Sequence, residues 1–402
     1  MTQLLDLAVA GLTVGMIYAL IALGYTMVYG VLEFINFAHG EVFTVGAYLA
    51  AFVLIWAGVQ PETPTATRLA WMAAALAFAV PLTAALGLVI ERVAYRPLRG
   101  SSRIIALLSA IGVSIILQNL IILIYGPETI SIPSLVPGFI TVAGTRIRLI
   151  AIIIIIVSIV LMGALTWLIR STRIGKAMRA TSQDREAAEM MGIDTNRTIA
   201  FTFLVGSALA AVGGFFVVLY YGTLKYDTGF LYGLKAFTAA VLGGIGSIPG
   251  AVIGSLALGL AEVFGVGIEL GVLAVFFAMG LAVGLYVQFV RAPRKRLQHL
   301  HPAQRTPEYE RELTLLYRLT PVYAVRRVLG ERTDALMDVS ARDALRLMGG
   351  NLFLAGVVVL FALNANYQID TKWQNVIAFA VLMLILLFRP SGILGEHLPE
   401  KV

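Results

Sequence analysis

Nine apolar runs, several of them about 20 residues long, dominate this chain of 402 residues. A helix of about 20 apolar residues crosses the hydrocarbon layer of a bilayer. Only 13% of the residues are charged, against about 25% in a soluble domain, so the chain lacks the ionic surface of a water-soluble fold. The sequence therefore predicts an all-α, polytopic membrane helical bundle. The predicted spans are 7–31, 42–58, 70–90, 104–125, 149–169, 199–220, 267–290, 351–366 and 373–388.

A further apolar stretch, 236–265, is interrupted by glycines and a proline, which weaken helix interiors. Irregular backbone at membrane depth occurs only where protein or a cavity covers it, and broken helices often form substrate sites in transporters. We therefore expect a re-entrant or broken segment. Its alternative role is close helix packing through the G-x-x-x-G pair Gly250 and Gly254. Glu262 fits an interface anchor as well as a pathway residue. The candidate pathway glycines are Gly243, Gly244 and Gly246.

The basic residues predict the orientation of the bundle. Of the 30 Lys and Arg residues, 24 fall in four segments, 91–103, 170–198, 291–350 and 389–402. Because cytoplasmic loops are enriched in Lys and Arg, these segments and the C-terminus are expected in the cytoplasm. An odd number of crossings then puts the N-terminus outside. The net charge of +7 is thereby explained by topology, and nucleic acid is not an expected partner.

A polar group interrupts the apolar sequence between the first two spans. Residues 35–50 read INFAHGEVFTVGAYLA, which brings Asn36, His39 and Glu41 close to membrane depth. Ionisable groups there normally face a cavity, a partner or the aqueous boundary. One interpretation is a helix break beside the translocation path. The other is a polar turn at the membrane interface, with Asn36 capping the next helix.

The sequence lacks the motifs of several enzyme classes. It contains no G-x-x-x-x-G-K-[ST] loop for ATP, no H-E-x-x-H zinc motif and no cysteine. We expect a transport protein that binds no cofactor itself, and a membrane-embedded lipid enzyme ranks last.

The loop 170–198 contains a short predicted helix over 184–191. Gly192 suits the position after a helix C-terminus, where a left-handed backbone turns the chain, and Asp194 or Thr195 can begin the next helix. A compact helix held between two membrane spans can act as a lever on a partner. A merely solvated loop is the alternative.

At this loop the sequence resembles the permease subunits of ABC importers, whose coupling helix carries an E-A-A pattern followed by glycine. The matching residues are Glu186, Ala187, Ala188 and Gly192. The chain is similar to the LivH-type permeases of the branched-chain amino acid uptake family. The likeness is carried by GLTVGMIYALIALGYTMVYGVLEFINFAHGEVF at 11–43, ERVAYRPLRGSSRIIALLSAIGVSIILQN at 91–119, KAFTAAVLGGIGSIPGAVIG at 235–254 and RPSGILGEHLPEKV at 389–402.

The resemblance implies an ABC importer permease fold in a bacterial inner membrane and a heteromeric importer. The partners would be a second, LivM-like permease, two ATP-binding subunits that hold ATP and Mg²⁺, and an external solute-binding protein that delivers branched-chain amino acids. It implies that 186–192 dock on an ATPase. Urea or short amides remain alternative solutes, and a self-sufficient carrier or channel for a small neutral solute remains an alternative class.

The chain departs from the LivH pattern in one region. We expect a membrane permease core over 1–266, an insert over 267–366 with two spans flanking the basic cytoplasmic segment 291–350, and a final span and cytoplasmic tail over 367–402. Two added crossings return the chain to the same side of the membrane, so the core topology is retained.

Overall fold

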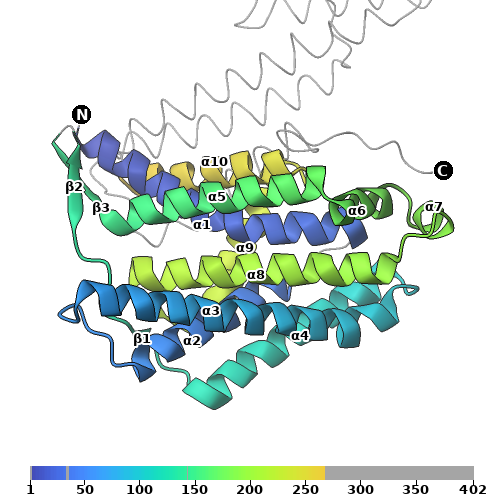
Figure 1. Ribbon diagram of the computed structural model, residues 1–402, viewed down its shortest axis with the longest axis horizontal. Helices are drawn as coiled ribbons and strands as arrows, with labels where there is room; N and C mark the ends of the chain where they lie inside the picture. Colours follow the sequence, from blue (N-terminus) through green and yellow to red (C-terminus); the bar gives the residue numbers. More distant parts are fainter. Residues whose placement is uncertain (1, 33–35, 143, 268–402) are drawn as a thin grey trace, which may run out of the picture. The chain divides into compact units, whose positions relative to one another are not determined.

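The computed structural model describes residues 2–32, 36–142 and 144–267 (Figure 1). The described part is almost entirely helical. Its helices are α1 (Thr2–Leu32), α2 (His39–Trp56), α3 (Thr65–Ile90), the π-helical turn η1 (Glu91–Tyr95), the 3-10 turn η2 (Arg96–Leu98), α4 (Arg103–Tyr125), α5 (Leu149–Ser171), α6 (Arg173–Gln183), α7 (Arg185–Met190), α8 (Thr195–Tyr221), α9 (Thr228–Gly243) and α10 (Ile248–Gly267). Its strands are β1 (Ile130–Ser131), β2 (Phe139–Val142), β3 (Thr145–Arg148) and β4 (Thr223–Leu224).

Six of the predicted spans are present in the described part as helices long and apolar enough to cross a bilayer. The broken segment is also confirmed, because α9 and α10 meet at an angle of 119° after a short break and together make a seventh candidate span. The spans predicted at 267–290, 351–366 and 373–388, and the segment 291–350, lie outside the described residues, so the domain boundaries stay a prediction.

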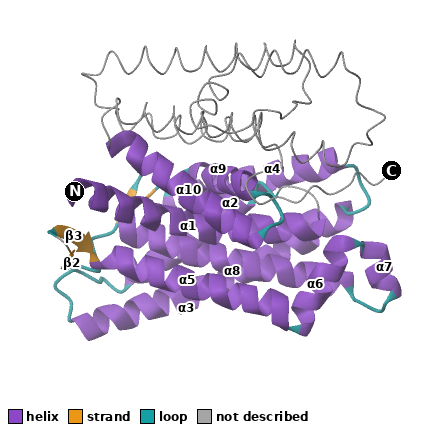
Figure 2. Ribbon diagram, turned by 90° about the horizontal axis from the view of Figure 1, so that it is seen from above, coloured by secondary structure: helices purple, strands orange, loops and turns teal. Residues whose placement is uncertain are grey.

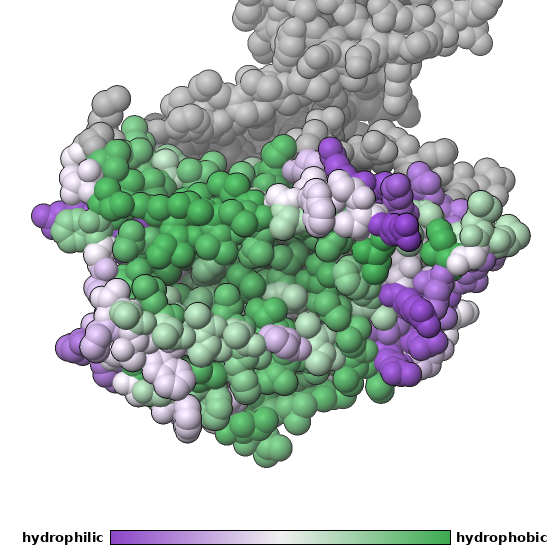
Figure 3. Space-filling model, in the orientation of Figure 1, coloured by the Kyte–Doolittle hydropathy of each residue, from purple (hydrophilic) through white to green (hydrophobic). Residues whose placement is uncertain are grey.

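Three helices form the centre of the bundle. In their most apolar windows, α1 and α2 are 72% buried and α8 is 83% buried, whereas α3, α4 and α5 are 33% buried or less. Small residues let the central helices approach closely: a Cβ on Gly46 of α2 would lie 2.7 Å from Ala211 Cα of α8. The outer helices therefore carry the apolar surface that faces lipid or another membrane subunit (Figure 3).

The two ends of the bundle differ. Figures 1 and 2 show α6 and α7 at one end and the β2–β3 hairpin at the other, where α1 begins. Segments 91–103 and 170–198 carry ten Lys and Arg residues at the α7 end, and the opposite end carries Arg68, Arg146, Arg148 and Lys225. This asymmetry supports the predicted orientation, with α7 in the cytoplasm.

Two local expectations were wrong. Residues 91–98 are not a loop but continue α3 as a π turn and a 3-10 turn. The chain also forms two short antiparallel pairs that the hydropathy pattern does not indicate: β2 pairs with β3 between α4 and α5, and β1 of the same connection pairs with β4, which follows α8. Each pair involves at most four residues per strand, so the chain is still an all-α membrane protein with small extramembrane hairpins.

Candidate functional site

The polar residues before and at the start of α2 are deeply buried. Asn36, His39 and Glu41 are 3%, 2% and 1% exposed, so this segment is not a solvated turn at the interface. The expected side-chain cap is also wrong, since the N-cap of α2 is Ala38 and no side chain caps the helix. Asn36 contributes its backbone carbonyl instead, which accepts the N–H of His39 at 3.0 Å.

The His39 ring lies in a notch between α1 and α8. A Cβ on Gly24 of α1 would clash with Nε2 of His39, and Gly206 of α8 is close to the same ring. The ring of Tyr25 packs edge-on against it, with 4.9 Å between ring centroids. Local glycines thus make room for a buried imidazole at the junction of three helices.

Glu41 extends from the first turn of α2 toward α4. Its Oε1 accepts a hydrogen bond from Gln118 Nε2 at 2.7 Å, and Oε2 has no hydrogen-bond partner among the described residues. Gly40, one residue earlier, packs against α9, because a Cβ there would lie 2.5 Å from the carbonyl oxygen of Gly229. The start of α2 therefore links α4 on one side with α9 on the other.

The α9–α10 bend depends on glycine at several positions. Gly244 and Gly246 have φ angles of +106° and +90°, which residues with a Cβ rarely adopt. After the turn the two helices touch through backbone: a Cβ on Gly250 would clash with backbone atoms of Gly243, and a Cβ on Gly254 with those of Ala239 and Gly243. The packing role predicted for the G-x-x-x-G pair is confirmed, and Gly243 is its partner.

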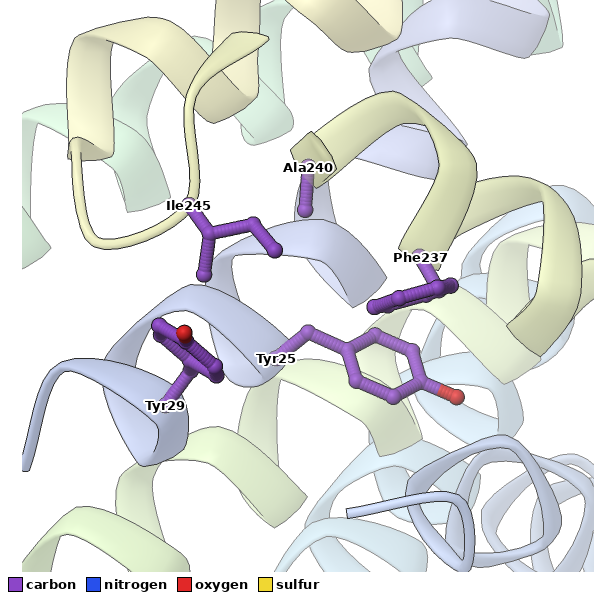
Figure 4. Close-up of a pocket in the computed structure, with 5 residues that line it drawn as sticks. All are labelled: Tyr25, Tyr29, Phe237, Ala240 and Ile245. Atoms are coloured by element: carbon purple, nitrogen blue, oxygen red, sulfur yellow. The ribbon is translucent and has the colours of Figure 1, made fainter. Parts of the chain in front are cut away.

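A small apolar cavity lies beside this bend (Figure 4). It is lined by Tyr25 and Tyr29 of α1, Phe237 and Ala240 of α9, and Ile245 between the two positive-φ glycines. Its water-accessible volume is about 10 Å³, which is room for about one water molecule. Among the candidate pathway residues, the glycines at 244 and 246 flank a cavity residue, whereas Asn36, His39 and Glu41 are not among the residues that line it.

A buried ion pair joins α9 to α10. Lys235 Nζ lies 2.5 Å from Glu262 Oε1, and the other carboxylate oxygen accepts a hydrogen bond from Tyr18 OH of α1 at 2.8 Å. The two charged side chains are 11% and 2% exposed. Glu262 is therefore neither an exposed interface anchor nor a free pathway group. It ties both arms of the bend to α1.

The predicted helix in the loop 170–198 is confirmed as α7. Asp184 caps it by accepting the N–H of Ala187 at 3.0 Å. At its end, the N–H of Gly192 bonds the carbonyl of Glu189 and the N–H of Ile193 bonds that of Ala188, with Gly192 at φ +82°. This is a Schellman motif, and it stops the helix sharply.

The surface of α7 shows which residues are free to contact a partner. Glu186 is exposed and Ala187 is half-buried, whereas Ala188 packs inside the chain. Met190 and Met191 are each 82% exposed, and large apolar side chains at such exposure are typical of a contact surface. Hydrogen bonds from Thr195 and Arg185 lower the pKa of the Glu189 carboxyl, so this residue is ionised at neutral pH.

Sequence reasoning missed several residues of this region. The ion pair of Lys235 with Glu262 was not foreseen, although two opposite charges inside one apolar stretch are a usable signal. The contacts of Glu41 with Gln118, and of Gly24 with His39, depend on tertiary packing and leave no local signal.

Comparison with known proteins gives a consistent result. The family described as branched-chain amino acid transport system / permease component matches residues 7–288. The high-affinity branched-chain amino acid transport system permease protein BraD of Pseudomonas aeruginosa is 48% identical over 64% of this chain and 84% of its own length. LivH of Escherichia coli is 48% identical over 63% and 82%, and a probable LivH of Methanocaldococcus jannaschii is 29% identical over 60% and 75%. No solved structure gives a significant match.

Proposed function

This chain belongs to the family of permease components of branched-chain amino acid transport systems, and we propose that it forms part of the translocation path of an ATP-driven importer. The observation that carries the proposal is α7, a short helix capped at both ends, exposed at the basic end of the bundle and carrying the E-A-A and glycine pattern. Relatives named as branched-chain amino acid permeases favour leucine, isoleucine and valine over urea or short amides as cargo.

The importer is expected to contain a second, LivM-like permease, two ATP-binding subunits and an external solute-binding protein. This chain holds no cofactor in the proposal, and ATP with Mg²⁺ binds to the partner subunits. The complex lies in a bacterial inner membrane, with α7 and the C-terminus in the cytoplasm. The apolar surfaces of α3, α4 and α5 face lipid and the second permease.

In the proposed cycle, closure of the ATPases on ATP moves α7 as a rigid body. Glu186, Met190 and Met191 provide its exposed contacts, and Ala188 anchors the helix to the rest of the chain. Ala187 is half-buried and contributes to the packing of the helix, and Gly192 ends it. Because the Schellman turn fixes the helix at a defined angle to α8, a push on α7 is passed on and is not absorbed by a flexible loop.

We propose that the amino acid passes beside the α9–α10 bend. The cavity beside Ile245, at about 10 Å³, has room for about one water molecule, so it has to widen to admit leucine. The turn 243–246 supplies the hinge. Asn36, His39 and Glu41 lie on either side of Gly40, where the start of α2 packs against α9. The Oε2 atom of Glu41 has no hydrogen-bond partner among the described residues and suits the ammonium group of an amino acid.

The test is transport by the complex that co-purifies with this chain, reconstituted with its solute-binding protein. ATP-dependent uptake of leucine is expected. Glu186→Lys should abolish coupling by reversing the exposed charge on α7, and Gly192→Pro should do so because proline cannot adopt φ +82°. Glu128→Lys, an exposed charge reversal near β1 at the opposite end, is the matched control and should retain uptake. Normal uptake by both α7 variants would contradict the coupling role, and uptake by this chain alone would favour a self-sufficient carrier.

A further inference from the structure

A series of polar contacts runs from the exposed helix α7 into the bundle. It begins at Glu189 of α7, whose Oε1 accepts a hydrogen bond from Thr195 Oγ1 at 2.5 Å. Thr195 is the first residue of α8 and is 2% exposed. The next residue, Asn196, turns its side-chain oxygen toward a different element and accepts a hydrogen bond from Arg99 Nη1. The start of α8 thus connects α7 to the segment that follows α3.

Arg99 joins two elements with one guanidinium group. Its Nη1 donates to Asn196, and its Nη2 forms an ion pair with Glu91, the first residue of η1. The side chains of Arg99 and Glu91 are only 6% and 4% exposed. Arginine presents its donors in a rigid planar fork, so a shift at one end is carried to the other. A buried ion pair adds little net stability but is costly to break, which suits a positioning role.

The π-helical turn η1 forms the next link. Helices of this type are rare, occur mostly as single turns within α-helices, and are frequent at functional sites. At its far end, Tyr95 is 1% exposed and its hydroxyl donates to Asn36 Oδ1 at 2.6 Å. The backbone carbonyl of Asn36 in turn holds the N–H of His39 in the first turn of α2. One end of η1 is therefore attached to the α7 side through Arg99, and the other to the break between α1 and α2.

The π turn η1 has a simple alternative conformation, the α-helical turn. A π turn contains one residue more than the α-helical hydrogen-bonding pattern requires, and its conversion to α rotates the residues after the turn by about 100°, one residue step of an α-helix. Such a change would move Tyr95 relative to Asn36 while α3 stays in place. Ser109 of α4 donates to the carbonyl of Ala94 at 3.2 Å and so satisfies a group inside the π turn. A physical argument for coupling between distant sites needs an element with two conformations, and the π and α conformations of η1 would provide them.

We propose, on the basis of the function proposed above, that Arg99 and Tyr95 are positioning residues that transmit the movement of α7 through η1 to the break between α1 and α2. Neither residue lines the cavity beside the α9–α10 bend, and neither belongs to the exposed surface of α7. Their role is to make the opening of the path depend on the position of α7.

The experiment compares Tyr95→Phe and Arg99→Lys with wild type in the reconstituted complex, with leucine uptake and ATP hydrolysis measured in the same vesicles. Tyr95→Phe removes one oxygen and keeps the ring beside Phe203, 5.5 Å away between centroids. Tyr48→Phe is the control, since the Tyr48 hydroxyl is buried and has no hydrogen-bond partner among the described residues. We expect leucine transported per ATP to fall about fivefold in both test variants, the factor that corresponds to one lost buried hydrogen bond, with no change in Tyr48→Phe.

A second readout separates transmission from general stability. The chain has no cysteine, so a single cysteine at Val31, in the last turn of α1, can be labelled cleanly. Its labelling rate should change on ATP binding in wild type and lose that change in Tyr95→Phe. If Arg99→Lys does not assemble, Tyr95→Phe alone decides the test. Wild-type uptake per ATP and an unchanged labelling response in Tyr95→Phe would overturn the inference and leave the proposed function intact. Absence of ATP-dependent leucine uptake in wild type would overturn both.

Discussion

Replacing Lys235 by methionine should destabilise the chain strongly, because it leaves the Glu262 carboxyl buried without its counter-ion. The ammonium lies 2.5 Å from the carboxylate, and the Glu262 side chain is 2% exposed. Removal of one partner of such a pair typically costs about 3–5 kcal/mol. The carboxyl can take up a proton instead of staying charged, and this sets the lower end of the range.

Two further variants separate the contributions of the ion pair and of the hydrogen bond. Tyr18→Phe removes only the hydrogen bond of 2.8 Å to the same carboxylate, which predicts a loss of about 1.5–3 kcal/mol. The double variant Lys235→Met/Glu262→Met removes both charges and keeps much of the volume. It should cost about 1–3 kcal/mol, because replacing a buried ion pair by apolar residues is often neutral but the buried Tyr18 hydroxyl loses its acceptor.

The assay is unfolding in mixed micelles by titration with SDS, followed by tryptophan fluorescence, for wild type and the three variants. In the expected order of stability, wild type comes first, the double variant and Tyr18→Phe follow at similar values, and Lys235→Met is last. A free energy of unfolding within about 1 kcal/mol of wild type for Lys235→Met would refute the reasoning, since the threshold lies well below the cost of an unpaired buried charge. A double variant that loses more stability than Lys235→Met would refute it as well.

Three further substitutions test the packing and the caps. Gly254→Ala should lower the free energy of unfolding by about 1–3 kcal/mol, because the new methyl group clashes with backbone. Gly112→Ala is the control and should be neutral or slightly stabilising, because a Cβ there meets nothing within 4 Å. Equal effects of the two substitutions would contradict the close contact at Gly254. Gly24→Ala should be similarly destabilising because the new methyl meets His39, and wild-type stability would show that the notch is roomier. Asp184→Ala should cost α7 about 1 kcal/mol and reduce recovery of ATPase subunits with the chain; undiminished recovery would argue against α7 as the docking element.

The elements that could be predicted from the sequence are those whose cause is local. Apolar length gave the six described spans, glycine and proline content gave the broken segment 236–265, and cap chemistry gave α7 with Gly192 after its end. Each depends on residues close together in the chain, so its physical cause can be read without the tertiary structure.

The residues that were misjudged depend on distant parts of the chain. Asn36 looks like a helix cap by position, but the hydroxyl of Tyr95, 59 residues later, takes its side-chain oxygen. Residues 91–98 look like a basic loop, yet Arg99 and Glu91 pair inside the bundle, and this pairing accompanies a helical continuation of α3. The sequence left open whether Asn36, His39 and Glu41 lie at the interface or beside the path, and only the tertiary structure shows that all three are buried.

The central claim is that α7 lies on the cytoplasmic face and docks on the ATP-binding subunits, and labelling of one cysteine tests it most directly. Met191→Cys introduces the only thiol of the chain, at a position that is 82% exposed in wild type. A membrane-impermeant maleimide should label it in inverted vesicles stripped of ATPase subunits, and rebound ATPase should protect it. Labelling from outside intact cells, or equal labelling with and without the ATPase, would contradict the account.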